Sequence, residues 1–293
     1  MNRFISSALL VLLTASAFAE DPILYARPRE LGRLANTDIK ASAGIAISLE
    51  NENLLWSHNR GDTLPRFFGF NLQGTHVVEY RIDAKLIELQ DMASYRVERQ
   101  ATLVFADVGD YELKRKSYVL YLLREPRMTK APKFGKIDTI KPQMTLEFTY
   151  DTGPQHCQAV AVDASDPKAI KFIFISSNEG GNCIVYELPM PGTRDKGPLV
   201  AKTIAKLTIP TVTSLDISPD GSRMMVLTYG DGYEFTRTGD KKWSDALATK
   251  PRILEMPIRH KGEAICYGAD GKTLYLTADG ARTPLWMVGV REE

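Results

Sequence analysis

The amino-acid sequence predicts an all-β fold of the β-propeller class. Two apolar runs divided by a Pro-Asp-Gly turn form a hairpin within residues 215–231, which read LDISPDGSRMMVLTYGD. Similar hairpins recur along the chain, and further short apolar runs follow them. Short β-branched and aromatic runs separated by Asn, Asp, Gly and Pro are typical of strands, and no long segment has a helical period.

The hairpin is found in five places, with irregular spacing. The intervals between the starts of the inner strands are 47, 67, 58 and 47 residues, from the differences between the position numbers. Four antiparallel strands repeated in this way are typical of propeller blades. The predicted starts are Gly44, Asp91, Gln158, Asp216 and Glu263.

A third strand is expected at 67–70, 118–122, 184–188 and 285–288, and a fourth at 77–82, 145–150 and 203–209. The last repeat lacks an outermost strand. We expect Ile23–Arg27 or Ile39–Ala41 to supply it, so that pairing between the two ends of the chain closes the ring and removes an exposed edge. The prediction is five blades, with six as the alternative if residues 124–150 conceal a degenerate blade.

The N-terminus has the pattern of a cleavable secretory signal. Residues 1–19 contain Arg3, an apolar run from Phe4 to Leu13, and the small-residue motif Ala17-Phe18-Ala19. The apolar run is short for a membrane span. We therefore expect cleavage after Ala19, a periplasmic or secreted protein, and one propeller domain over residues 20–293.

Charge excludes one class of partner. Without residues 1–19 the chain has 36 basic residues (37 minus Arg3) and 36 acidic residues. A balanced charge argues against binding nucleic acid or an anionic membrane through a general basic field. We expect a monomer that binds a small molecule or a protein.

The three cysteines allow at most one intramolecular disulfide. Cys157 and Cys183 are the closest pair in sequence, and the alternative is that Cys157, Cys183 and Cys266 are three small buried hydrophobic residues. There is no Cys-x-x-Cys spacing, and the four histidines are scattered, so a zinc site has little support.

Polar residues are expected to converge on one rim, because an inner strand begins on the face where the second strand ends. We predict a ligand-binding rim there. Its residues are His58, Asn59, Asp91, Asp107, Asp110, Gln158, Asn178, Glu179, Asp231 and Asp279.

Three acids at inner strands form a candidate metal site. Asp91, Asp216 and Glu263 would crowd the channel mouth, and Ca²⁺ suits several carboxylate oxygens in a flexible cage. A cation acting as Lewis acid, with His58 or a rim carboxylate as base, would make a hydrolase. The alternative is structural, since polar side chains at strand ends often cap backbone amides. The turn acids Asp220 and Asp270 are assigned to hairpin turns on the opposite face.

Several short motifs, in order, carry a resemblance to a family: His58-Asn59-Arg60-Gly61-Asp62, Leu89–Ala93, Asp107–Asp110, Thr228–Asp231 and Gly262–Ile265. Over residues 42–290 the chain resembles a group of uncharacterised secreted bacterial β-propellers and, more distantly, gluconolactonase-like and NHL-type propellers. The resemblance implies a propeller fold, and gluconolactonase-like enzymes hold a divalent metal at the channel mouth on Glu, Asn and Asp ligands.

The chain departs from that family pattern where charge matters. Gln90, Gln158 and Arg60 stand at positions where the pattern tends to have acids, and only Asp216 and Glu263 match the metal ligands in kind. The first functional hypothesis is therefore an exported binding or interaction module with no recognisable nucleophile motif. The alternative is a Ca²⁺-dependent hydrolase of the lactonase or esterase type, and a propeller with a redox or quinone cofactor is a third, weaker hypothesis.

Overall fold

The structure is a computed structural model that describes residues 23–61, 65–128, 137–177, 180–192, 197–239, 241–259 and 261–291. The predicted signal peptide, Asn178 and Glu179 lie outside these residues. The fold is all-β and compatible with a β-propeller, and in the described ranges the helical content is one short helix, α1 (Trp243–Leu247). None of the described helices is long and apolar enough to cross a membrane.

The strands are short and follow one another closely along the chain. Their bounds are β1 (Arg29–Arg33), β2 (Ser42–Ile47), β3 (Leu54–Asn59), β4 (Arg66–Asn71), β5 (His76–Ile82), β6 (Leu89–Val97), β7 (Gln100–Asp107), β8 (Tyr118–Arg124), β9 (Asp138–Ile140), β10 (Met144–Tyr150), β11 (Cys157–Asp163), β12 (Lys171–Ser176), β13 (Asn182–Pro189), β14 (Leu199–Thr208), β15 (Val212–Ile217), β16 (Arg223–Thr228), β17 (Gly232–Thr236), β18 (Arg252–Leu254), β19 (Gly262–Tyr267), β20 (Leu274–Ala278) and β21 (Pro284–Val288).

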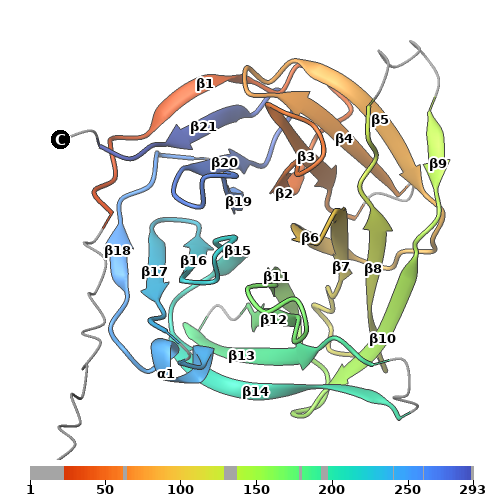
Figure 1. Ribbon diagram of the computed structural model, residues 1–293, viewed down its shortest axis with the longest axis vertical. Coiled ribbons are helices and arrows are strands. Elements are labelled where there is room, and N and C mark those ends of the chain that lie inside the picture. Colours follow the sequence, from red (N-terminus) through yellow and green to blue (C-terminus); the bar gives the residue numbers. More distant parts are fainter. Residues whose placement is uncertain are drawn as a thin grey trace, which may run out of the picture.

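The strands form sheets that surround a central axis (Figure 1). The sheet orders are β2-β3-β4-β5-β9, β11-β12-β13-β14-β10-β8-β7-β6, β15-β16-β17-β18 and β1-β21-β20-β19. The strands β2, β6, β11, β15 and β19 lie innermost, and each contacts the next around the axis, with β19 contacting β2. Figure 1 shows β1, β5, β10, β14 and β18 on the outside.

The two ends of the chain meet in one sheet, as the sequence predicts. Strand β1 pairs antiparallel with β21, with Arg29 opposite Met287. The expected closing segments were 23–27 or 39–41, whereas the closing strand is Arg29–Arg33, which lies between them. Each expected segment contributes one isolated bridge, Tyr25 to Val290 and Ala41 to Asp279.

The segment 124–150 adds strands to the sheets around it. β10 pairs antiparallel with β8 as the fourth strand of its unit, and β9 pairs in parallel with β5. β10 also pairs in parallel with β14 of the next unit. In its described part, the segment therefore contains no further four-strand unit.

Apolar side chains fill the spaces between neighbouring four-strand units. One such cluster packs Phe148, Phe174 and Tyr186 between β10, β12 and β13, and the Phe148 and Phe174 rings are stacked at 4.9 Å between centroids. Large fully buried aromatic rings remove much apolar surface from water, which is the main stabilising contribution in such a core.

Buried acids connect neighbouring units. Glu125, which follows β8, accepts a hydrogen bond from Trp56 Nε1 on β3 at 2.9 Å. Asp163 on β11 accepts one from Trp243 Nε1 of α1 at 2.9 Å and also binds Arg237 at 2.7 Å. Because each acid pairs with donors from a neighbouring unit, these contacts fix the units relative to one another.

The three cysteines are free and buried, so the expected Cys157–Cys183 disulfide is wrong and the alternative of buried apolar residues is supported. Cys157 lies on β11 and Cys183 on β13, with β12 between them. Two strand spacings separate such residues by about 10 Å, whereas a disulfide needs Cα atoms within about 7 Å.

Candidate functional site: the central channel and its two mouths

The rim residues Asn59 and Asp107 cap backbone amides. The Asn59 side-chain oxygen accepts hydrogen bonds from the Lys40 and Ala41 N–H groups at 2.8 and 3.0 Å. Asp107 does the same for the residues before β6, accepting from Ile87 at 3.0 Å and Glu88 at 2.7 Å. Both residues pair with the first residue of an inner strand, so they hold equivalent positions in two units. Their geometry supports the structural alternative.

Asp110 is also occupied by local donors. Its carboxylate accepts hydrogen bonds from the Lys114 and Arg115 N–H groups and from the Tyr118 hydroxyl at 2.8 to 2.9 Å. Burial raises its pKa, but these hydrogen bonds outweigh burial and leave the pKa below the usual value. Asp110 therefore stabilises the loop after β7 as an anion.

Gln158 pairs with His156 beside it. The Asp110 N–H donates to His156 Nδ1 at 2.9 Å, so the other ring nitrogen, Nε2, carries the hydrogen. The Gln158 amide lies 2.9 Å from that nitrogen through its Nε2 position, and turning the amide by 180° would bring its oxygen there as the acceptor. The two side chains thus lie against each other at the strand-start mouth.

His58 is fully buried between β3 and its neighbours, with Nδ1 3.1 Å from the Asn59 carbonyl oxygen. Burial lowers its pKa to about 4. The ring is therefore neutral at physiological pH and shielded from solvent, which argues against the role of a base that reaches a ligand.

Asp91 fills the middle of the channel. Its carboxylate accepts hydrogen bonds from the N–H groups of Met92 (2.9 Å), Val160 (3.0 Å) and Leu215 (3.4 Å) and from the Ser214 hydroxyl (3.2 Å). These donors lie on three different inner strands. Burial raises its pKa well above the usual value. Asp91 thus joins the strands and separates the two mouths of the channel.

The five predicted inner-strand positions do not share one register. Each inner strand has a bulge at its second residue; Gln158 and Glu263 occupy this position in their strands, whereas Asp91 is the residue after the bulge. Asp216 lies two residues further along, opposite Met225 and one residue before the end of β15. The sequence spacing alone did not reveal where each strand begins relative to its bulge, so it aligned different positions of the five strands.

Consequently Asp216 does not lie on the rim with Glu263. It lies near the hairpin turn, at the opposite mouth of the channel, where it lines a cavity together with Ser218 and Pro219. The remaining predicted metal ligand, Glu263, binds Arg60 at 3.1 Å at the strand-start mouth, and Asp279 lies 3.9 Å from the same guanidinium.

The three acids of the predicted calcium site therefore occupy three levels of the channel, each with its own partners. Among the described residues, no group of three or more His, Cys, Asp or Glu side chains could hold a metal ion. Asp231, predicted for the rim, accepts from the Thr228 N–H through its backbone carbonyl at 3.1 Å.

The turn-side mouth holds a cavity of about 330 Å³. It is lined by the ends of the inner strands and by the turns that follow them. Apolar side chains from four of these strands and turns line it together with polar side chains from β6, β15, β19 and the turns after them. The lining residues are Ile47, Leu49, Ser94, Tyr95, Arg96, Glu98, Val162, Ala164, Asp216, Ile217, Ser218, Pro219, Tyr267 and Ala269.

Most polar groups around the cavity already have partners. The Ser94 hydroxyl donates to the Ile47 carbonyl at 2.8 Å, and the Ser218 hydroxyl donates to Asp220. Tyr267 donates its hydroxyl to Glu234 at 3.2 Å, and Arg96 binds Glu50 at 3.3 Å. These groups shape the cavity rather than offer free hydrogen bonds.

Asp216 places a carboxylate in the lining of the cavity. Its Oδ2 accepts the Tyr267 N–H at 2.8 Å, and the Ile217 N–H is a second backbone donor to the carboxylate. Burial of the carboxylate raises its pKa to about 7. A partly exposed carboxylate with a perturbed pKa in an apolar cavity is typical of a binding site.

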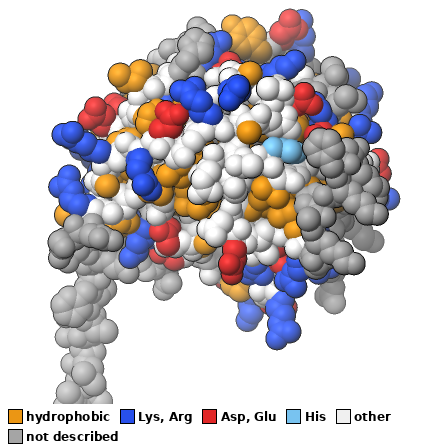
Figure 2. All heavy atoms as spheres, turned by 90° about the horizontal axis from the view of Figure 1, so that it is seen from above, with side chains coloured by type: hydrophobic (Ala, Val, Ile, Leu, Met, Phe, Trp, Pro, Cys, Tyr) orange, Lys and Arg blue, Asp and Glu red, His pale blue; other side chains and the backbone are white. Residues whose placement is uncertain are grey.

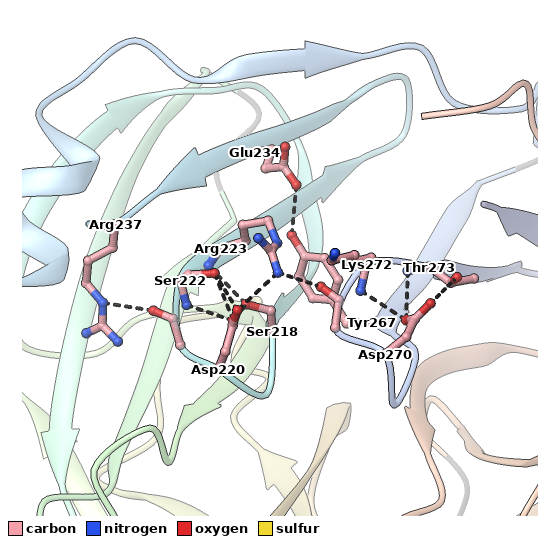
Figure 3. Close-up of polar contacts among 12 residues, drawn as sticks. Ser218, Asp220, Ser222, Arg223, Glu234, Arg237, Tyr267, Asp270, Lys272 and Thr273 are labelled. Atoms are coloured by element: carbon pink, nitrogen blue, oxygen red, sulfur yellow. Dashed lines mark hydrogen bonds and ion pairs between the residues drawn. The ribbon is translucent and has the colours of Figure 1, made fainter. Parts of the chain in front are cut away.

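The turns beside the cavity are held by a polar network (Figure 3). Asp220 accepts the Ser222 N–H at 3.0 Å and binds Arg223 at 3.2 Å. Arg223 also donates to the Gly271 carbonyl at 3.0 Å, which connects this turn to the turn at Asp270 in the next unit. Asp220 and Asp270 thus lie in turns, as predicted, and the cavity has rigid edges.

The sequence did not single out Tyr95, Arg96, Glu98 or Tyr267 as site residues. A usable signal was the length of the second hairpin, since β6 has nine residues and the other inner strands have six or seven. The longer hairpin carries residues 94–98 past the ends of the other inner strands, to the mouth of the cavity.

Comparisons with known proteins leave the family open. No family model matches this sequence, and no curated protein matches it. Among the solved structures that match is one titled "Crystal structure of glucose dehydrogenase", with 12% identity and a TM-score of 0.49, covering 91% of this chain and 100% of that chain. At this TM-score the match carries no argument about function. The resemblance to secreted propellers stays a prediction.

Proposed function

We propose that this chain is an exported five-bladed β-propeller that binds a small ligand in the cavity at the turn-side mouth of its central channel. The blade count is supported by the ring of inner strands and by apolar clusters between successive units. Export is supported by the sequence pattern of residues 1–19.

The observation that carries the proposal is the cavity itself. Its volume of about 330 Å³ lies within the range of small-molecule sites, its walls combine apolar and polar side chains, and Asp216 places a carboxylate in its lining. Asp91 lies deeper in the channel, where it is fully buried and bonded to three inner strands. By contrast, the predicted rim residues Asn59, Asp107 and Asp110 are bonded to their own backbone.

The charge of the outer surface favours a small ligand over a highly charged macromolecule. Figure 2 shows Lys, Arg, Asp and Glu side chains interspersed on the face it presents. A mixed surface provides no single-sign field to attract a nucleic acid. We therefore favour recognition inside the cavity.

A fragment-binding experiment tests this proposal. Ligand-observed NMR with a fixed set of neutral, cationic and anionic aromatic fragments is run on the wild type, on Ala269→Phe and on Ala281→Phe. Ala269 lines the cavity and is exposed, so a phenyl ring there blocks the cavity without disturbing the core. Ala281 is exposed in the loop between β20 and β21, at the opposite face, and serves as the matched control.

We expect fragments to bind the wild type and Ala281→Phe and to lose at least about tenfold in affinity for Ala269→Phe. The proposal is overturned if no fragment binds the wild type, or if Ala269→Phe binds fragments as well as the wild type does.

A further inference from the structure

We propose that the cavity selects an organic ammonium group with an apolar body, held by the Asp216 carboxylate in its lining. This inference rests on the proposed function, since it names the ligand class of the same cavity. It begins from the hydrogen-bond inventory. Ser94, Ser218 and Tyr267 donate their hydroxyl hydrogens to other groups, whereas the Asp216 carboxylate in the lining is an acceptor that suits a ligand with a hydrogen-bond donor.

The charges around Asp216 favour a cationic donor. Asp91 lies behind it in the channel and raises the cost of negative charge at both acids, while Glu98 stands at the cavity mouth. Arg96 is the cation in the lining, and it is paired with Glu50. A ligand cation would therefore relieve an uncompensated carboxylate, whereas a ligand anion would add to the repulsion.

The approach to the cavity also carries more acidic than basic side chains. A wider groove of about 720 Å³ adjoins it and shares Ile47, Leu49, Arg96 and Ala269 with the cavity. Its acidic members are Glu50, Glu52 and Asp270, against the single arginine. Such a groove raises the local concentration of cations near the mouth.

The apolar walls decide between an organic ammonium and a bare metal ion. Ile47, Val162, Ala164 and Pro219 offer no oxygen ligands, and a hard cation needs six or more oxygens. An ammonium on an aromatic or aliphatic body can place its hydrogens on Asp216 and bury its carbon skeleton against these walls.

The charges of the titratable side chains around Asp216 can be assigned between pH 6 and 8. On β6 these are Asp91, Tyr95 and Arg96, with Glu98 after the strand, and on β19 they are Cys266 and Tyr267. Burial raises the pKa of Cys266 and of both tyrosines, so these three stay neutral. The pKa of Asp216 at about 7 makes it a group whose charge changes within this range.

Three probes of similar size test the inference: benzylammonium, benzyl alcohol and benzoate, titrated by NMR or calorimetry. At pH 8 we expect the wild type to bind benzylammonium at least about tenfold more tightly than benzyl alcohol and not to bind benzoate detectably. Lowering the pH to 6 should weaken benzylammonium binding by up to about tenfold, because protonation neutralises Asp216.

The variant Asp216→Asn keeps the acceptor for the Tyr267 N–H and removes the charge. We expect this variant to bind benzylammonium and benzyl alcohol with similar affinity and to lose the pH dependence of benzylammonium binding. Ala281→Phe should keep the preference for benzylammonium and its pH dependence. If Asp216→Asn retains the preference for the ammonium, or if benzyl alcohol or benzoate binds the wild type as tightly, the ammonium inference is wrong. If the ammonium inference fails but benzyl alcohol still binds in the cavity, the proposed function stands. If none of the three probes binds, the ammonium inference and the proposed function are both wrong.

Discussion

Replacing Asp216 by asparagine should stabilise the protein at neutral and alkaline pH and leave its stability nearly unchanged in acid. In the folded protein, burial raises the pKa of this carboxyl from the ordinary 3.8 to about 7. Between these two values the folded state holds a proton that the unfolded state has released. The carboxyl therefore lowers the free energy of unfolding as the pH rises through this range, and the loss is complete above about pH 7.

The size of the effect follows from the shift. One pKa unit corresponds to about 1.4 kcal/mol, so the full shift sets an upper bound of roughly 4 kcal/mol. Part of the penalty is screened because the side chain is partly exposed to the cavity. We expect Asp216→Asn to gain roughly 1–3 kcal/mol at pH 8, or a few degrees in Tm, and nothing near pH 4.

The assay is urea unfolding of the wild type and Asp216→Asn at several pH values between 4 and 8. Other titrating groups are common to both proteins, so they cancel in the difference. Asp220→Asn is the control of opposite sign. Burial raises the Asp220 pKa, but hydrogen bonds from Ser218 and Ser222 outweigh burial and leave the pKa below its usual value. Relative to the wild type, this variant should therefore lose stability as the pH rises. An Asp216→Asn difference that is the same at pH 5 and pH 8 would refute the reasoning.

Three further predictions concern the closure of the ring, the thiols and calcium. Gly32→Ala should destabilise the protein by about 2 kcal/mol or more, because a Cβ there would lie 2.2 Å from the Gln73 carbonyl oxygen; chemical denaturation checks this, and an unchanged midpoint contradicts the placement of β1. Thiol titration in denaturant without reductant should find three free thiols in the purified chain, and a value of one would show that a disulfide forms. Millimolar Ca²⁺ should leave the Tm unchanged, since Asp91, Asp216 and Glu263 lie at different levels of the channel; a rise of several degrees would restore the calcium hypothesis.

The strand pattern was predictable because it depends on local chemistry. The turn at Asp220 and the runs on either side of it determine β15 and β16, and most predicted third and fourth strands match the observed ones within a few residues. The fourth repeat was incomplete in the sequence analysis, because β17, α1 and β18 follow an irregular stretch with no strong alternation.

The site was harder to predict because it depends on register. Glu263 occupies the bulge of its inner strand, Asp91 is the residue after the equivalent bulge, and Asp216 lies two positions further along its strand. A shift of a few residues moved Asp216 from one mouth of the channel to the other. The partners of Asn59 and Asp107 lie about 20 residues away in sequence, so their role as caps appears only after the strands pair.

The central claim is that a ligand occupies the turn-side cavity and binds Asp216. A crystal structure of the protein soaked with benzylammonium at pH 8 tests it most directly. The account predicts the probe in this cavity, with its nitrogen about 3 Å from Asp216 Oδ1 and its ring against the apolar walls. Density for the probe only at the strand-start mouth, beside Arg60 and Glu263, would contradict the account.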